Sequence, residues 1–187
     1  MTLELASLTA IRQFTQDLAA ADLPSLGALV CNAGVQVVTG TTTTTDGFEM
    51  TFGVNHLGHF LLANLLLPRC VPCGRIIVVS SDTHDPAART GMPAPAYPSA
   101  EQLARAAPVP AGVKVGAIGR QRYTTSKRCN VLCAYEFARR LHARQSAITV
   151  NAFNPGLMLD TGLVCDYSKG HLILKLSAPK IRKCKKC

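Results

Sequence analysis

Three short apolar runs, each followed by a small polar turn, dominate the pattern along the chain. They occupy residues 28–31, 75–79 and 147–150, and Asn-Ala-Gly, Ser-Ser and Asn-Pro-Gly follow them. Their apolar character is continuous rather than alternating, which is typical of parallel strands buried on both faces. We therefore expect three parallel strands covered by helices on both faces.

Two helical patterns fill the first intervals between these runs. Residues 6–23 repeat apolar side chains at steps of three and four, and Pro24 follows. Asp46-Gly-Phe-Glu49 is similar to a capping box, and it predicts a second helix that Pro68 ends.

A third helix is expected from about residue 123 to residue 144. Its buried side is predicted to hold apolar residues at helical spacing, namely Val131, Leu132, Tyr135 and Leu141. Strands that alternate with helices favour an open α/β sheet with right-handed crossovers.

Two segments are predicted to be loops. Residues 41–45 are five consecutive threonines, and residues 82–122 contain six prolines and four glycines. A loop as long as 82–122 inside a compact domain is usually functional or disordered.

Composition places the chain among globular proteins. With 187 residues and 48% hydrophobic residues it can form one domain with a sizeable core. No apolar run approaches the roughly 20 residues that span a bilayer, and the N-terminus carries Glu4 without a basic leader. We expect a soluble, cytoplasmic protein with no transmembrane segment.

The net charge of +9 is concentrated at one end of the chain. Residues 169–187 hold seven basic and no acidic side chains, so the remainder carries a balance of only +2. We therefore divide the chain into an α/β domain at 1–168 and a basic Lys/Cys-rich tail at 169–187. Because a nucleic-acid-binding domain carries its basic surface on the folded body, no nucleic-acid partner is expected. Binding of the tail to nucleic acid or an anionic membrane is the alternative.

The eight cysteines include two C-x-x-C pairs, Cys70–Cys73 and Cys184–Cys187. More than a hundred residues separate the pairs, so we expect no metal site. Reduced thiols are expected in the absence of an export signal.

The most informative motif is Tyr123-Thr-Thr-Ser-Lys127, because side chains four residues apart share one side of a helix. A free phenol has a pKa of about 10. A cation at about 4 Å, in an effective dielectric near 20, contributes roughly 4 kcal/mol, or about three pKa units. Lys127 is thus predicted to lower the pKa of Tyr123 to a value close to 7. A phenol with such a pKa can exchange a proton with an alcohol or carbonyl oxygen at neutral pH.

Two further polar residues are candidates for the same chemistry. Ser81 ends an apolar strand, at the edge where open α/β sheets bind their ligands, and its hydroxyl can donate to a substrate oxygen. Ser80 is the alternative, since the serine doublet leaves the assignment uncertain by one residue. Asn55 lies within an otherwise apolar helix and must satisfy its amide there.

Five motifs together resemble the short-chain dehydrogenase/reductase family over about residues 3–166. They are Leu-Val-Cys-Asn-Ala-Gly at 29–34, Val-Asn-His-Leu-Gly-His-Phe at 54–60, Ile-Ile-Val-Val-Ser-Ser at 76–81, Tyr-Thr-Thr-Ser-Lys at 123–127 and Asn-Pro-Gly at 154–156. The second motif and Ser-Lys-Arg-Cys-Asn-Val-Leu at 126–132 further resemble the branch that includes retinol dehydrogenases and protochlorophyllide reductases. The resemblance implies a Rossmann-like, doubly wound parallel sheet.

The resemblance also implies an oxidoreductase that uses NADP(H) or NAD(H) to interconvert a small or lipophilic alcohol and a carbonyl. Tyr123 would be the general acid/base, and Lys127 would assist it and hold the nicotinamide ribose. Ser81 would polarise the substrate oxygen, and Asn55 would anchor a water in the proton relay. The implied cofactor-binding residues are Asn32, Ala33 and Gly34 on the adenosine side, and Pro155, Gly156, Leu157 and Thr161 over the nicotinamide. A homo-oligomer is possible.

The sequence departs from the family pattern at its first residues. The glycine-rich turn that cradles the pyrophosphate is missing, and Gly112, Gly116 and Gly119 have the wrong spacing to replace it. We expect an incomplete sheet that lacks the first family strands. The alternative function is accordingly a catalytically inactive, truncated relative that persists as a binding protein or a remnant.

Overall fold

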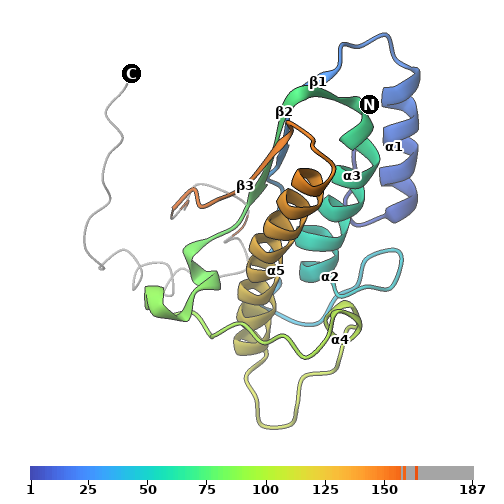
Figure 1. Cartoon of the computed structure of the whole chain (residues 1–187). Coiled ribbons are helices and arrows are strands. Elements are labelled where there is room, and N and C mark those ends of the chain that lie inside the picture. Colours follow the sequence, from blue (N-terminus) through green and yellow to red (C-terminus); the bar gives the residue numbers. More distant parts are fainter. Residues whose placement is uncertain (157, 159–162, 164–187) are drawn as a thin grey trace.

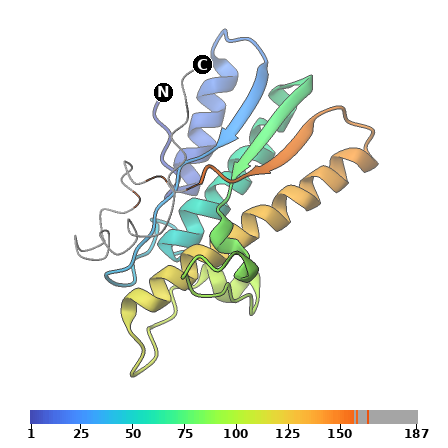
Figure 2. The same cartoon turned by 90° about the vertical axis from the view of Figure 1, so that its left-hand side faces the viewer.

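Three parallel strands form the centre of the computed structural model, which describes residues 1–156, 158 and 163. They are β1 (Leu26–Cys31), β2 (Cys70–Val79) and β3 (Thr149–Phe153), paired in the order β1-β2-β3 (Figure 2). The predicted α/β class with a small parallel sheet is confirmed. β2 begins five residues earlier than predicted, and its pairing with β1 shifts register between Leu26 and Ala28.

The main helices pack on one side of this sheet (Figure 1). They are α1 (Leu8–Ala20), α3 (His59–Leu66) and α5 (Val115–Ala143). α1 packs on α3, and α5 packs on β2 and β3. Two apolar clusters result, one around Ile11 and Leu62 and the other around Ile76 and Ala134.

The opposite face of the sheet differs from the expectation. Val30 on β1 is 55% exposed and Phe153 on β3 is 52% exposed. Among the described residues, helices cover one face only, so the burial of both faces that the apolar runs indicated is not observed. The open face agrees with the expected incomplete sheet. Apolar residues such as Val30 were predicted to be buried, although they lie on the open face of the sheet.

The second predicted helix is divided into several segments. It begins with α2 (Met50–Phe52), continues through a π-helical turn η1 (Gly53–Gly58) into α3, and ends in the 3-10 turn η2 (Leu67–Arg69). Glu49 caps its N-terminus, because its carboxylate accepts from the N–H groups of Thr51 and Phe52. The predicted capping box was therefore misplaced: Asp46 accepts instead from the N–H of Leu8, at the start of α1.

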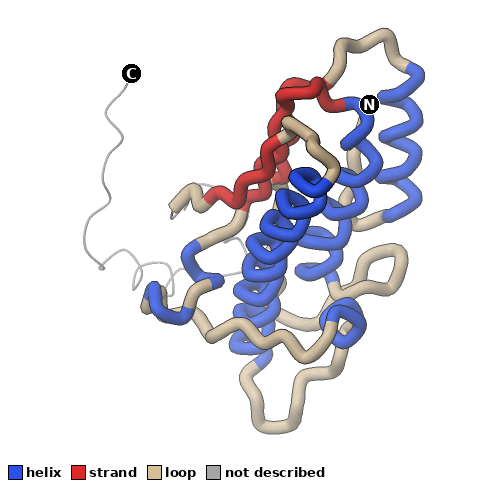
Figure 3. Tube along the Cα trace, viewed as in Figure 1, coloured by secondary structure: helices blue, strands red, loops and turns tan. Residues whose placement is uncertain are grey.

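The predicted 82–122 loop is partly helical (Figure 3). It holds η3 (Asp82–His84), η4 (Pro86–Ala88) and α4 (Ala100–Ala104), and α5 begins at Val115, eight residues before the predicted start. A Cβ at Gly119 would lie 2.1 Å from the carbonyl oxygen of Val37. Gly119 therefore permits a close approach of α5 to the segment after β1 and does not break the helix.

The buried side of α5 also corrects the sequence analysis. Of the four apolar residues predicted there, Leu141 is buried, Val131 is half-buried, and Leu132 and Tyr135 are exposed. Polar side chains take their place, namely Thr124, Thr125, Ser126, Lys127 and Asn130. The basic tail at 169–187 lies outside the described residues. Among the helices of the described part, none has the length and apolar character needed to cross a bilayer.

Candidate active site

Tyr123 and Lys127 lie together on the buried side of α5, as their spacing predicts. Tyr123 is 7% exposed and Lys127 is 4% exposed, and the ammonium Nζ lies 5.5 Å from the centroid of the phenol ring. Nζ donates a hydrogen bond to the carbonyl oxygen of Val79, at 3.2 Å. Burial lowers the pKa of Lys127 from 10.5 to about 8, because the interior solvates its charge poorly.

Asn55 lies in the π-helical turn, a type of irregularity that is frequent at functional sites. Its Oδ1 accepts from the N–H of Val35 at 2.7 Å, and its Nδ2 donates to Val35 O at 2.9 Å and to Ser126 Oγ at 3.1 Å. Ser126 in turn donates to Tyr123 O at 2.7 Å. The amide therefore ties the segment after β1 to the turn of α5 that carries Tyr123.

The turn after β1 reaches the same place. A Cβ on Gly34 would lie 3.2 Å from Asn55 Oδ1 and 3.7 Å from Lys127 Nζ. Asn32 and Ala33 are exposed beside it at the carboxyl end of β1. The structure thus brings the predicted Asn-Ala-Gly motif to Asn55 and Lys127.

The two serines that follow β2 have different environments. Ser80 is 4% exposed, and its Oγ donates to Lys127 O at 2.8 Å. Ser81 is half-buried and caps η3, accepting from Thr83 N at 3.3 Å and donating to Asp82 Oδ1 at 3.2 Å. Because Ser80 binds α5 inside the core, Ser81 is better placed to meet a ligand.

The third strand end contributes Pro155 and Gly156, which are both exposed. Gly156 has φ of 77° and donates its N–H to Asn154 Oδ1 at 3.1 Å. Leu157 and Thr161, the other predicted residues of this segment, lie outside the described residues.

Sequence reasoning missed several residues that build this site. Ser126 and Asn130 each follow a motif residue by three positions on α5, so they share its buried side. His59 is 5% exposed, and its Nδ1 lies 3.2 Å from Asn55 O. The i+3 spacing could have identified Ser126 and Asn130, whereas no sequence signal pointed to the Val79 carbonyl.

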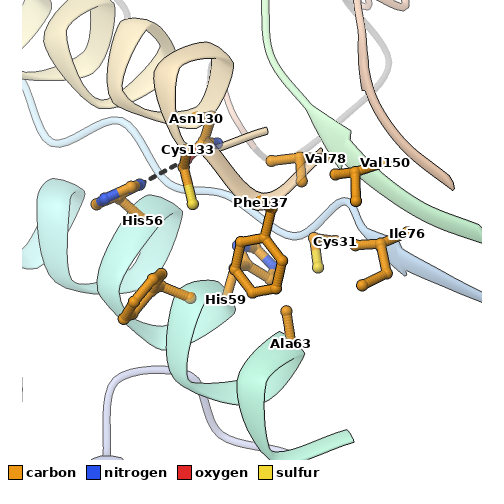
Figure 4. A pocket seen from close by; sticks show the side chains of 11 residues that line it. Cys31, His56, His59, Ala63, Ile76, Val78, Asn130, Cys133, Phe137 and Val150 are labelled. Atoms are coloured by element: carbon orange, nitrogen blue, oxygen red, sulfur yellow. Dashed lines mark hydrogen bonds between the residues drawn. The ribbon is translucent and has the colours of Figure 1, made fainter. Parts of the chain in front are cut away.

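A small cavity of about 10 Å³ lies behind the site (Figure 4). Cys31 and Cys133 line it together with His56, His59 and Asn130. Burial raises the pKa of Cys31 to about 12 and that of Cys133 to about 11, so both thiols stay protonated at neutral pH. Among the described residues, no group of three or more His, Cys, Asp or Glu side chains could hold a metal ion.

Comparison with known proteins agrees with this arrangement. The family model for short chain dehydrogenases matches residues 1–99. Protochlorophyllide reductase A of Arabidopsis thaliana is 38% identical over 178 residues, covering 87% of this chain and 43% of the relative. The protochlorophyllide reductase of Avena sativa is also 38% identical and is covered to 56%. The chain thus spans about half the length of these curated relatives.

Solved structures share this fold. An uncharacterised protein from Mycobacterium paratuberculosis superposes with a TM-score of 0.65 at 32% identity, covering 88% of this chain and 52% of that one. A metagenomic short-chain oxidoreductase solved in complex with NADP has a TM-score of 0.56 at 24% identity, covering 84% and 59%. Together with the motifs at the three strand ends, these matches show that the chain belongs to the short-chain dehydrogenase family, in the branch of the protochlorophyllide reductases.

Proposed function

We propose that this chain carries the catalytic site of an NAD(P)(H)-dependent oxidoreductase that interconverts an alcohol and a carbonyl. The observation that carries the proposal is the buried pair Tyr123–Lys127, with Nζ 5.5 Å from the ring centroid and Gly34 and Asn55 beside it. A phenol beside a buried ammonium group is suited to exchange a proton with a substrate oxygen. NADP(H) is the proposed cofactor, with NAD(H) as the alternative.

In the direction of reduction, Tyr123 Oη–H donates its proton to the carbonyl oxygen, and the ammonium of Lys127 stabilises the phenolate that remains. In the direction of oxidation, the phenolate takes the proton of the alcohol. Ser81 Oγ donates a hydrogen bond to the same substrate oxygen as negative charge develops on it. A bound nicotinamide supplies or accepts the hydride in this chemistry.

Several described residues at the strand ends support the binding of such a cofactor. Gly34 leaves the backbone beside Lys127 free of a side chain, and Asn32 and Ala33 expose the adjoining turn. We assign Asn32, Ala33 and Gly34 to the adenosine side of the cofactor, Tyr123 and Lys127 to its nicotinamide side, and Pro155 and Gly156 to the segment over the nicotinamide. The pyrophosphate end of the cofactor has no matching glycine-rich turn within residues 1–156.

Asn55 has a structural part in this proposal. Its amide is bonded to Val35 and Ser126, so it positions the Tyr123 turn against the end of β1. The predicted water of the proton relay would then bind at its main-chain oxygen, which also accepts from His59 Nδ1.

A titration of NADPH fluorescence with the full chain tests this function. Saturable binding is expected, and Tyr123→Phe should keep the binding while it lowers turnover of an aromatic aldehyde by roughly 10²-fold. Tyr135→Phe is the matched control, because Tyr135 lies on the same helix but is 71% exposed. Absence of saturable binding would support the inactive alternative instead.

A further inference from the structure

A hydrogen-bond chain that the proposed reaction does not use runs across the site. His56 Nδ1 on η1 lies 3.0 Å from Asn130 Oδ1 on α5, shown as the dashed line in Figure 4. Asn130 Nδ2 then donates to the carbonyl oxygen of Val79, at 3.2 Å. Asn130 is 2% exposed, so its buried amide makes hydrogen bonds with these two partners in place of water.

The chain has a fixed direction. Because Val79 O can only accept, the amide must present its Nδ2 to it and its Oδ1 to His56. His56 therefore donates through Nδ1–H. Burial lowers the pKa of His56 below 6.5, so the ring is neutral at physiological pH and carries its proton on Nδ1.

The end point of the chain is the atom that holds the proposed catalytic lysine. Val79 O accepts from Asn130 Nδ2 and from Lys127 Nζ, both at 3.2 Å, which uses both of its lone pairs. Val79 is the last residue of β2, and Ser80 joins the next position to α5 through Lys127 O. Asn130 and Ser80 thus fasten the carboxyl end of the strand to the turn of α5 that carries Lys127.

We propose that His56 and Asn130 are positioning residues for Lys127, which fix the Val79 carbonyl so that the ammonium stays beside the Tyr123 ring. The catalytic consequence rests on the proposed function, whereas the effect on Lys127 itself can be measured without cofactor. Within the part of the chain that the structure describes, the titratable groups that face Lys127 are Tyr123 on its own helix and His59 on α3. His59 is neutral above pH 6.5, because burial and the Lys127 charge lower its pKa.

Two variants test the chain from opposite ends. His56→Phe keeps an aromatic ring between Phe52 and Phe60, which both contact the His56 ring, but removes the donor to Asn130. Asn130→Leu removes both hydrogen bonds at similar volume. His56→Gln restores a donor, and Asn64→Leu is the matched control, since Asn64 is exposed on α3 and donates within its own helix, to Phe60 O.

The first measurement uses the full chain without cofactor, and follows acetylation of Lys127 by acetic anhydride against pH by peptide mass spectrometry. The wild-type midpoint is expected near pH 8. In His56→Phe and Asn130→Leu the limiting rate should rise about three-fold or more, as expected for loss of one ordinary hydrogen bond. The midpoint should move toward 10.5, because a loosened ammonium is better hydrated.

His56→Gln and Asn64→Leu should behave as the wild type, and acetylation of exposed Lys114 should be unchanged in every variant. Thermal melts identify a variant that does not fold. If Asn130→Leu does not fold, the comparison of His56→Phe with His56→Gln tests the proposal, since both variants retain the Asn130 side chain. Unchanged Lys127 reactivity in folded His56→Phe overturns the proposal.

The second measurement uses NADPH and an aromatic aldehyde. In His56→Phe, kcat should fall about ten-fold while KM changes less than about two-fold, as expected when a group is misplaced after substrate has bound. A wild type without cofactor binding contradicts the proposed function and leaves the acetylation result valid. A wild type that turns over, with His56→Phe unchanged in both measurements, contradicts the positioning role alone.

Discussion

The two halves of α5 pack on the same side of the same sheet with opposite chemistry. The first half buries Thr124, Ser126 and Lys127, whereas the second half buries Ala134 and Leu141. The second half completes the apolar cluster around Ile76 and Val78, and its contact is replaceable by other apolar groups of similar volume. The first half binds by specific hydrogen bonds, each of which needs its partner at one position.

The apolar second half of α5 stabilises the domain, whereas the polar first half forms the candidate site. Burial of polar groups and an ammonium stabilises a fold less than apolar contact of the same area, because each group must recover the hydrogen bonds that it made with water. The polar half of α5 meets the carboxyl end of β2 at Val79 and Ser80, and it is joined to the segment after β1 through Asn55. Ligands bind at the carboxyl ends of the strands in open α/β sheets. Variants in the apolar half should therefore lower stability without changing the site, whereas variants in the polar half should change function as well as stability.

The largest expected effect on stability is in the apolar half. Ile76 is 1% exposed and packs in the cluster with Val78 and Ala134. Ile76→Ala should lower the free energy of unfolding by about 4 kcal/mol, because it removes three buried carbons and leaves a cavity. Urea denaturation measures the loss. In the fraction that stays folded, the acetylation midpoint of Lys127 should be unchanged, and a shift there would show that the halves are coupled.

The second effect has the opposite sign and depends on pH. Lys127 titrates near 8 in the folded chain and near 10.5 when unfolded, so below pH 8 the buried charge costs on the order of 3 kcal/mol. Lys127→Met should therefore be more stable than the wild type at pH 7. The advantage should shrink as pH rises above 8 and disappear by about pH 10.5.

The same variant should lose turnover although it gains stability. Exposed Lys114, at the start of the same helix, supplies the control, and Lys114→Met should show no such pH dependence. Melting temperatures recorded from pH 7 to pH 10.5 check both. A stability difference that stays constant across this range would mean that Lys127 is not buried as a charged group.

The smallest expected effects on stability compare the loss of a buried hydrogen bond with the replacement of an exposed apolar side chain. Ser126→Ala leaves Asn55 Nδ2 without one of its acceptors, and should cost about 1 kcal/mol in unfolding free energy. Leu132→Gln, at a side chain that is 47% exposed, should change stability by less than about 0.5 kcal/mol. Chemical denaturation of both variants tests the ranking, and a larger loss for Leu132 would indicate that this side of α5 is covered in solution.

The sequence predicted the three strands and the shared helix side of Tyr123 and Lys127, because these depend on local pattern and helical spacing. The nearness of Asn55 and Ser81 to this pair was implied by the family resemblance, and the structure brings Asn55 and Gly34 to Lys127. The prediction from sequence failed along α5. An apolar periodicity rule selected Leu132 and Tyr135, while the helix buries a polar stripe whose hydrogen-bond partners lie on η1 and β2. Gly119 was assigned to a loop for a similar reason. The close approach of the Val37 backbone, which requires a glycine at this position of α5, involves residues distant in sequence.

The π-helical turn makes this protein sensitive to the number of residues, and not only to their identity, between Gly53 and Gly58. Its wider winding lets two neighbours, Asn55 and His56, both reach α5, at Ser126 and Asn130. Shortening the segment by one residue would let the helix run regularly into α3, yet it would rotate one of the two neighbours away. A deletion that looks harmless, or even favourable, for helix formation would thus disconnect the end of β1 from the turn that carries Tyr123.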